Sequence, residues 1–179
     1  MIKLEPLTGH HDRNGFDCGV EPLNLWLKQT ALQHQSKGIS RTFVAVPAGA
    51  QATAVFHAAG CTDTGPMSII GYYALASAFV RVDELPQAIA KRYPRQIPVT
   101  RLGRLAVRTQ LKGQGLGQLL LVDAVSRARH AAQAVGSAGI MVDAKGSDAK
   151  GGDDAARFYQ RYGFAPCGHQ PLTLFLPMW

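Results

Sequence analysis

The chain has 179 residues, 46% of them hydrophobic and 17% charged, which is typical of a globular protein and excludes a disordered or fibrous chain. No apolar run reaches the length of a membrane span, no signal-peptide pattern opens the chain, and the three cysteines are widely spaced. These features predict a cytoplasmic protein with free thiols and no membrane association. The length predicts one domain over residues 1–179.

The first half of the chain predicts two helices and two strands. Apolar residues recur at helical spacing over 20–37, and Pro22 suits a first turn. β-Branched residues predict a strand over 42–46, and the segment 47–65 is expected to hold a strand end and a loop. A long strand follows over 68–80, with Gly71 as the site of a bend, and then a short helix over 83–91.

The second half predicts three strands and two helices. A proline-bracketed connector over 93–98 leads to a strand over 99–107. Apolar residues spaced by four and three predict a helix over 115–135, and two further strands are predicted over 140–144 and 171–177. Between those strands, a loop rich in glycine and lysine precedes a closing helix that Gly163 ends.

A glycine-rich turn joins the strand over 99–107 to the helix after it. Gly113, Gly115 and Gly117 let the backbone approach a ligand closely, and the turn aims several N–H groups and the positive end of the helix dipole at one point. A pyrophosphate suits such a turn. Spacing excludes two other phosphate loops, because no Gly-Lys-Ser/Thr run exists and Gln118 stands where a dinucleotide fingerprint needs its third glycine.

The turn and a second motif resemble the GNAT acetyltransferases. The run from Lys112 to Gly117 is similar to that family's coenzyme A loop, Gln/Arg-x-x-Gly-x-Gly/Ala, with Lys112 in the Gln/Arg place. The run AARFYQRYGF, from Ala155 to Phe164, resembles the family's closing helix. The resemblance implies an α/β (α+β) fold with a mixed, mostly antiparallel sheet of about six to seven strands and about four flanking helices.

One subgroup of that family is similar over nearly the whole chain. The stretch LNLWLKQTALQHQSKGISRTFV resembles the first helix and strand of the acetyltransferase toxins of bacterial toxin–antitoxin modules. The resemblance implies acetylation of the free α-amine of an aminoacyl-tRNA, which blocks translation. It also implies a homodimer neutralised by a ribbon–helix–helix antitoxin that binds operator DNA. The loop over 145–152 is longer than is usual in the subgroup.

Acetyl-CoA is therefore the expected cosubstrate, and no metal is expected. The backbone before the turn can pair with the pantetheine arm as a further strand, and the turn can hold the pyrophosphate. The residues expected to bind acetyl-CoA are Leu105, Ala106, Val107, Lys112, Gly113, Gln114, Gly115, Leu116, Gly117, Gln118 and Phe158.

Tyr159 is the candidate general acid, because the resemblance places the family's catalytic tyrosine there. Its phenol has a pKa of about 10 and can donate a proton to the departing thiolate at neutral pH. Two alternatives are a tyrosine that only packs in the core and an acid role for Tyr162 three residues on.

A base is absent where many GNAT enzymes carry a glutamate, since no acidic residue lies between Lys91 and Gln118. An α-amine has a pKa of about 8, which a neighbouring ester lowers further, whereas a lysine amine has one of about 10.4. The missing carboxylate therefore fits an aminoacyl ester better than a protein lysine or a polyamine. Asp143 remains an alternative base or a structural cap.

The positive charge is concentrated in one segment. The net charge is +7, and between Lys91 and His130 nine lysines and arginines face only Asp123. Such a segment is typical of a partner with many phosphates, although it also fits a solvated surface with ligands for the coenzyme. The candidates for contact with tRNA are Arg41, Arg92, Arg95, Arg101 and Arg104.

Two other functions remain open at this point. An acetyltransferase that acts on a small-molecule amine or a protein amino terminus would keep the coenzyme turn without needing the basic segment. A nucleic-acid-binding module that has kept only the fold would need neither Tyr159 nor the glycines of the turn.

Overall fold

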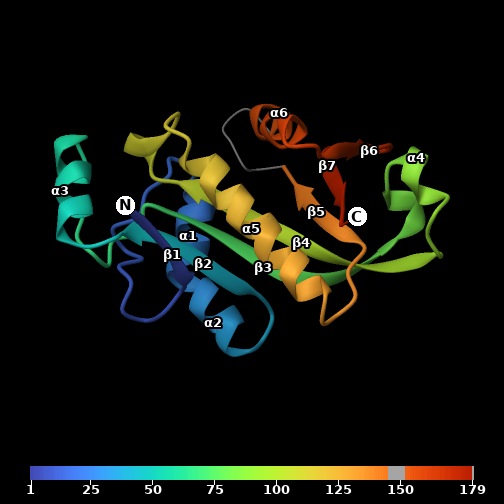
Figure 1. Cartoon of the computed structure of the whole chain (residues 1–179), viewed down its shortest axis with the longest axis horizontal. Helices are drawn as coiled ribbons and strands as arrows, with labels where there is room; N and C mark the ends of the chain where they lie inside the picture. The colour runs from blue at the N-terminus through green and yellow to red at the C-terminus, as the bar shows by residue number, and fades with distance from the viewer. Residues whose placement is uncertain (145–151, 179) are drawn as a thin grey trace. The chain divides into compact units, whose positions relative to one another are not determined.

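The computed structural model describes residues 1–144 and 152–178 and shows a mixed sheet with the strand order β1-β2-β3-β4-β5-β7-β6 (Figure 1). The strands are β1 (Ile2–Pro6), β2 (Arg41–Pro47), β3 (Gly71–Arg81), β4 (Gln96–Val107), β5 (Gly139–Asp143), β6 (Ala165–Cys167) and β7 (Gln170–Pro177). The described α-helices are α1 (Glu21–Gln29), α2 (Ala31–Ser36), α3 (Ala50–Ala58), α4 (Gln87–Ala90), α5 (Leu116–Ala132) and α6 (Asp153–Arg161). Two 3₁₀ turns, η1 (Val82–Glu84) and η2 (Thr109–Leu111), join them.

The predicted fold class is confirmed. β1 pairs antiparallel with β2, and β7 pairs antiparallel with both β5 and β6, whereas β4 and β5 run parallel. Seven strands agree with the prediction, while the described part of the chain has six α-helices where about four were expected.

The chain forms two compact units. Unit 1 comprises Met1–Ala74 and Arg104–Asp123, and unit 2 comprises Leu75–Gly103 and the chain from Ala124 onward. β3, β4 and α5 each begin in one unit and end in the other. The expectation of one domain over 1–179 stays a prediction.

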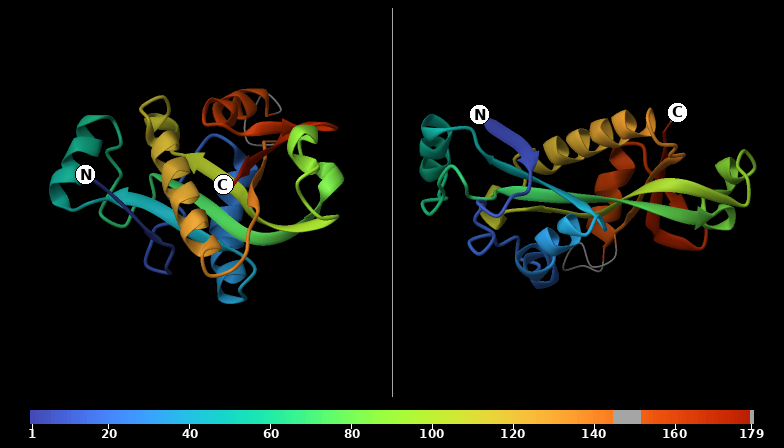
Figure 2. Two further views of the ribbon diagram at one scale, coloured as in Figure 1. Left: turned by 45° about the vertical axis from the view of Figure 1, so that its right-hand side comes forward. Right: turned by 90° about the horizontal axis from the view of Figure 1, so that it is seen from below.

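Unit 1 has its core between α1 and the sheet. Leu23, Trp26 and Leu27 lie on one face of α1 and are buried, which is the helical spacing that the sequence predicts. They pack against Val46 and Tyr72 of the neighbouring strands. Figure 2 shows α1 and α2 on one side of these strands and the start of α5 on the opposite side, so both faces of the sheet are covered in this unit.

A close approach in unit 1 explains the glycine at the start of β3. A Cβ atom at Gly71 would lie 2.9 Å from Cδ1 of Leu120 and 3.1 Å from the carbonyl oxygen of Ala106. Any larger residue would therefore push α5 and the end of β4 away from β3. The predicted bend at Gly71 is the beginning of the strand.

Unit 2 has a separate core. Val80, Ile97, Val99, Met141 and Phe175 are buried together, where β3, β4, β5 and β7 contribute their apolar sides. α6 packs on β7 in the same unit. The helix that carries the candidate acid is thus supported by the sheet beneath it.

The structure departs from the predicted elements in the first half of the chain. The helix predicted over 20–37 is interrupted at Thr30, whose φ of −120° is not helical. The segment 47–65 forms α3 instead of a strand end and loop. Its alanines favour a helix, and Gly49 and Gly60, with φ of 94° and 101°, flank it with conformations that glycine adopts readily.

Other departures concern strand ends and short strands. β4 begins at Gln96, so the expected connector over 93–98 is partly strand, and Pro98 accepts a hydrogen bond from the amide of Ala138 through its carbonyl. β1 and β6 were not predicted, because strands of five and three residues carry little periodic signal.

The remaining predictions concern the loop before α6 and the cysteines. The long loop predicted over 145–152 lies outside the described residues except for Gly152, which precedes α6 in a left-handed conformation with φ of 98°. All three cysteines are buried and free, as predicted. Within the described residues, no helix combines the length and apolar character needed to cross a bilayer.

Candidate functional site

The end of β4 extends beyond its parallel pairing with β5. That pairing covers Thr100–Leu102, and β4 continues to Val107. Ala106 is buried in the core of unit 1, whereas Leu105 and Val107 are half-buried. A strand that outruns its neighbour offers backbone groups to an extended ligand, which suits the pantetheine arm of coenzyme A.

The glycine turn follows η2 and leads directly into α5. Gly113 and Gly115 have φ of 77° and 85°, in the left-handed region that favours glycine. A Cβ atom would meet nothing within 4 Å at either position, so the backbone conformation, not crowding by the protein, is the reason for glycine. The protein leaves space beside both glycines on the side where a Cβ atom would lie.

The start of α5 supplies donors to the same turn. The amide of Leu119 donates to the carbonyl oxygen of Gly115 at 3.1 Å and begins the helical hydrogen bonds. The preceding N–H groups, those of Leu116, Gly117 and Gln118, belong to the first turn, whose amides have no acceptor within a helix. With the dipole of this 17-residue helix they can bind an anion, and Lys112 and Gln114 are exposed beside them.

Tyr159 lies in unit 2 on α6 and is 3% exposed. Its ring makes edge-to-face contacts with Phe158 and Phe164, with ring centroids 5.2 and 5.5 Å apart. Burial raises the pKa of the Tyr159 phenol above its usual range, so the hydroxyl remains a donor at neutral pH. The packing also means that Tyr159 is part of the core of this helix, as the alternative interpretation holds.

Phe164 is buried beside Tyr159, whereas Phe158 and Tyr162 are half-buried and Arg161 is exposed. The Phe158 ring contacts the Tyr162 ring, with centroids 5.1 Å apart, and the guanidinium carbon of Arg161 lies 5.9 Å from its centre. Asp143, the alternative base, is exposed at the end of β5 and has an interaction partner in the structure.

The predicted basic contacts divide between the two units. Arg41 is exposed at the start of β2 and Arg104 is half-buried on β4, both in unit 1. Arg92, Arg95 and Arg101 are exposed in unit 2. Within each unit these guanidinium groups are accessible to a phosphate, although Arg104 differs from the others.

Arg104 is held by an aromatic side chain. Its guanidinium carbon lies 4.2 Å from the centre of the Trp26 ring, and Trp26 stacks in turn on Tyr72 with an interplanar angle of 9°. Burial lowers the pKa of Arg104 without neutralising it. No carboxylate among residues 1–144 and 152–178 pairs with it, so its position is set by stacking and its charge is left for a ligand.

Arg108 is not part of the basic surface. It is 2% exposed, and its Nη1 lies 3.1 Å from Oδ1 of Asp63. The local excess of positive charge that the sequence indicates between Lys91 and His130 is therefore an overestimate for the surface. The carboxylate that neutralises Arg108 comes from outside that segment, and a count along the sequence could not include it.

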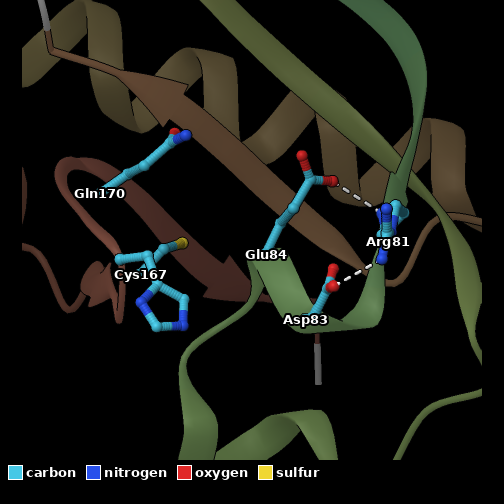
Figure 3. Close-up of a pocket in the computed structure, with 6 residues that line it drawn as sticks. Arg81, Asp83, Glu84, Cys167 and Gln170 are labelled. Atoms are coloured by element: carbon cyan, nitrogen blue, oxygen red, sulfur yellow. Dashed lines mark hydrogen bonds and ion pairs between the residues drawn. The ribbon is translucent and has the colours of Figure 1, made fainter.

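A pocket in unit 2 contains none of the predicted site residues. It is lined by Arg81, Asp83, Glu84, Cys167, His169 and Gln170. Figure 3 shows Asp83 and Glu84 turned toward Arg81, which donates to both at 2.8 and 2.7 Å, with Cys167 and Gln170 opposite. Burial and, to a smaller extent, Glu84 raise the pKa of the Cys167 thiol to about 11, so it is protonated and a poor nucleophile.

Comparison with known proteins decides the family. The family model described as "Acetyltransferase (GNAT) domain" matches residues 68–166. The tRNA-acetylating toxin of Mycobacterium tuberculosis is 33% identical over 167 residues, which cover 93% of this chain and 86% of the relative. The chain belongs to the GNAT acetyltransferase family. It is an acetyl-CoA-dependent N-acetyltransferase, as predicted.

Solved structures of GNAT toxins resemble this GNAT enzyme over almost its full length. AtaT complexed with acetyl-methionyl-tRNAfMet has a TM-score of 0.80 and 30% identity, covering 99% of this chain and 95% of that one. AtaTR bound with acetyl-CoA has a TM-score of 0.76 and 30% identity over 99% and 94%. An AtaT mutant bound to the C-terminus of the antitoxin AtaR has a TM-score of 0.74 and 28% identity over 99% and 93%.

The sequence did not identify two residues that contact the basic segment of this GNAT enzyme. Trp26 was assigned to the helix core, and Asp63 was placed in a loop without a role. Their partners, Arg104 and Arg108, lie 78 and 45 positions away along the chain. No local pattern records contacts over such separations, so only the tertiary structure identifies them.

Proposed function

We propose that this chain is the toxin of a toxin–antitoxin module and acetylates the free α-amino group of an aminoacyl-tRNA in the cytoplasm, which blocks translation. One observation carries the proposal: 99% of the chain superimposes on a toxin whose structure includes acetyl-methionyl-tRNAfMet, with 30% identity and a TM-score of 0.80. The whole-chain similarity to a tRNA-acetylating toxin supports the same substrate class.

Acetyl-CoA is assigned to the end of β4 and the turn after it. The backbone of Leu105–Val107 pairs with the pantetheine arm, and an N–H of this stretch polarises the acetyl carbonyl. The residues from Lys112 to Gln118 hold the pyrophosphate through backbone donors, with the Lys112 amine as an additional cation. The open space around Gly113 and Gly115 supports this assignment. Phe158 is assigned to the coenzyme by its place in the closing motif.

Tyr159 is proposed as the general acid of a direct transfer. The amine nitrogen attacks the acetyl carbonyl carbon, an amide bond forms, and the carbon–sulfur bond breaks. The thiolate then takes a proton from the Tyr159 hydroxyl, which solvent reprotonates, and the new amide loses its extra proton to solvent. Burial raises the pKa of Tyr159, so its hydroxyl keeps the proton at neutral pH. The assignment of Tyr159 as the acid rests on its place in the closing motif.

The acceptor needs little help from a base. The α-amine of an aminoacyl ester has a pKa below that of a free α-amine, about 8, and is largely neutral at physiological pH. The absence of any acidic residue between Lys91 and Gln118 is consistent with an acceptor that is already deprotonated. Asp143 is exposed at the end of β5 and is retained only as an alternative.

The tRNA is proposed to contact five arginines through its phosphates. These residues are Arg41, Arg92, Arg95, Arg101 and Arg104. Four are exposed, and Arg104 is oriented by Trp26 with its charge unneutralised. Phosphate contacts of this kind set affinity and register, so they position the aminoacyl end without selecting an amino acid.

The partners proposed for the protein follow the toxin subgroup. A ribbon–helix–helix antitoxin neutralises the enzyme and connects it to operator DNA, and the enzyme is a homodimer. The complex of AtaT with its antitoxin's C-terminus supports an antitoxin partner.

The test is to incubate the purified protein with acetyl-CoA and bulk charged tRNA and to analyse the aminoacyl ends by mass spectrometry. The expected result is a gain of one acetyl group on one or a few aminoacyl species. No gain on any aminoacyl-tRNA, with acetyl-CoA still bound, would overturn the toxin activity and favour a small-molecule amine or a protein amino terminus as acceptor.

A further inference from the structure

Arg108 joins the end of β4 to the turn and donates four hydrogen bonds to three residues of one earlier segment of unit 1. Its Nη1 donates to both carboxylate oxygens of Asp63 at 3.1 Å. Its Nε donates to the carbonyl oxygen of Ile69 at 3.3 Å, and its backbone N–H donates to that of Ile70 at 2.9 Å. The guanidinium is therefore both an ion-pair partner and a cross-link between two backbone segments.

The residues after Arg108 lead without interruption to the coenzyme turn. The carbonyl oxygen of Arg108 accepts a hydrogen bond from Leu111 at 2.9 Å and closes η2. On the other side, the backbone N–H and the hydroxyl of Thr109 both donate to the carbonyl oxygen of Asp17, at 3.0 and 3.2 Å. Lys112 and Gly113 follow directly, so the position of Arg108 determines where the turn begins.

Asp63 makes the buried position of Arg108 tolerable. A buried guanidinium without a partner is strongly unfavourable, and Asp63 is the carboxylate paired with it among the described residues. The two groups differ in exposure, since the Arg108 side chain is 3% exposed and that of Asp63 is 63% exposed. The charge of Arg108 is thus neutralised from the surface, and its burial leaves it no direct access to a phosphate.

We propose that Asp63 is a positioning residue for acetyl-CoA. By pairing with Arg108 it keeps the guanidinium bonded to the carbonyl of Ile69 and holds residues 108–113 in the conformation that presents the glycine turn to the pyrophosphate. This inference rests on the proposed coenzyme site and deepens it, because it assigns the control of that site to a residue distant in sequence.

The test compares acetyl-CoA affinity, measured by titration calorimetry without any acceptor, with thermal stability. We expect Asp63→Ala to raise the Kd for acetyl-CoA about tenfold, as when a charge-assisted hydrogen bond that orders a binding loop is lost. The value of kcat at saturating acetyl-CoA is expected to change less than about twofold, because the reacting groups are intact. Asp63→Glu keeps the carboxylate and is expected to restore most of the affinity.

A second variant separates positioning from general loss of stability. In Asp63→Ala/Arg108→Met the uncompensated buried charge is gone, so the Tm is expected to recover, but the cross-link to Ile69 is absent and the Kd remains high. Asp83→Asn, which breaks the exposed Arg81–Asp83 pair of unit 2, is the matched control and should change neither value.

Three results would overturn the proposal. Unchanged affinity in Asp63→Ala, or affinity that recovers together with the Tm in the double variant, would remove the positioning role and leave the coenzyme site standing. A wild-type protein that fails to bind acetyl-CoA would instead overturn the coenzyme site, and this inference with it.

Discussion

The turn after β4 contributes backbone groups to the proposed site, whereas α6 contributes side chains, the buried Tyr159 and the half-buried Phe158. In the turn, Gly113 and Gly115 are exposed and surrounded by open space. On α6, Tyr159 is enclosed by aromatic rings. Under the proposed function, the turn of unit 1 would bind the coenzyme through its backbone conformation, whereas α6 of unit 2 would supply the proton donor Tyr159 and the coenzyme contact Phe158.

Substitutions in the two regions should therefore change different quantities. A substitution in the turn should raise the Kd for the coenzyme and leave kcat nearly unchanged. Damage to Tyr159 should have the opposite effect, because its hydroxyl is needed when the thiolate leaves and not before.

The largest effect is expected from Tyr159→Phe. Removal of the hydroxyl should lower kcat for acetyl transfer at least about 100-fold, within the range for loss of a general acid, while the Kd for acetyl-CoA stays unchanged. Steady-state kinetics and calorimetry measure the two quantities. Tyr162→Phe is the matched control. Near-normal turnover in Tyr159→Phe would remove Tyr159 from the mechanism, and a loss confined to Tyr162→Phe would transfer the role to that residue.

A smaller effect is expected from Gly115→Ala. The left-handed conformation of Gly115, with φ of 85°, costs a residue with a Cβ about 1–2 kcal/mol, so the Kd for acetyl-CoA should rise about tenfold. Titration calorimetry with acetyl-CoA alone measures this Kd. Gly168→Ala, at a position without positive φ where a Cβ meets nothing within 4 Å, should bind normally. Equal affinities in the two variants would contradict the conformational argument.

A third variant tests whether tRNA binding depends on residues outside the turn and α6. Arg92→Glu/Arg95→Glu reverses two exposed charges, so the KM for aminoacyl-tRNA should rise about fivefold to tenfold, with a weaker dependence on salt. The Kd for acetyl-CoA should not change. Lys3→Glu/Lys37→Glu alters net charge equally outside the basic segment and serves as the control. A parallel loss of tRNA acetylation and acetyl-CoA binding would refute this separation.

The smallest effect concerns stability at high pH. Burial raises the pKa of Tyr159 in the folded protein, whereas the unfolded phenol ionises at about 10. The stabilising contribution is thus complete below pH 10 and is lost as the pH rises above it, by about 1 kcal/mol at pH 11. Denaturant titrations at pH 8 and pH 11 should show a smaller loss of unfolding free energy for Tyr159→Phe than for the wild type. An equal loss would mean that Tyr159 does not titrate as a buried group.

Much of the fold could be predicted from local sequence. β2, β4, α5 and β7 appear near their expected positions, because their apolar residues repeat at the spacing of a strand or a helix. α3 was missed because the glycines and threonines of the segment 47–65 favour a loop and outweighed its alanines, and the break at Thr30 has no signal of its own. The glycines of the turn were found by spacing, since positive φ restricts the residue type.

What the sequence by itself determined is the chemistry available to this GNAT enzyme: glycines where the backbone must turn, a tyrosine on a closing helix, and an excess of positive charge. Only the tertiary structure decided which charges act at the surface. Arg104 and Arg108 are four residues apart along the chain, yet the first is half-buried and stacks on Trp26, and the second is buried and neutralised by Asp63. The reason is physical, since burial and pairing depend on residues brought together from distant parts of the chain.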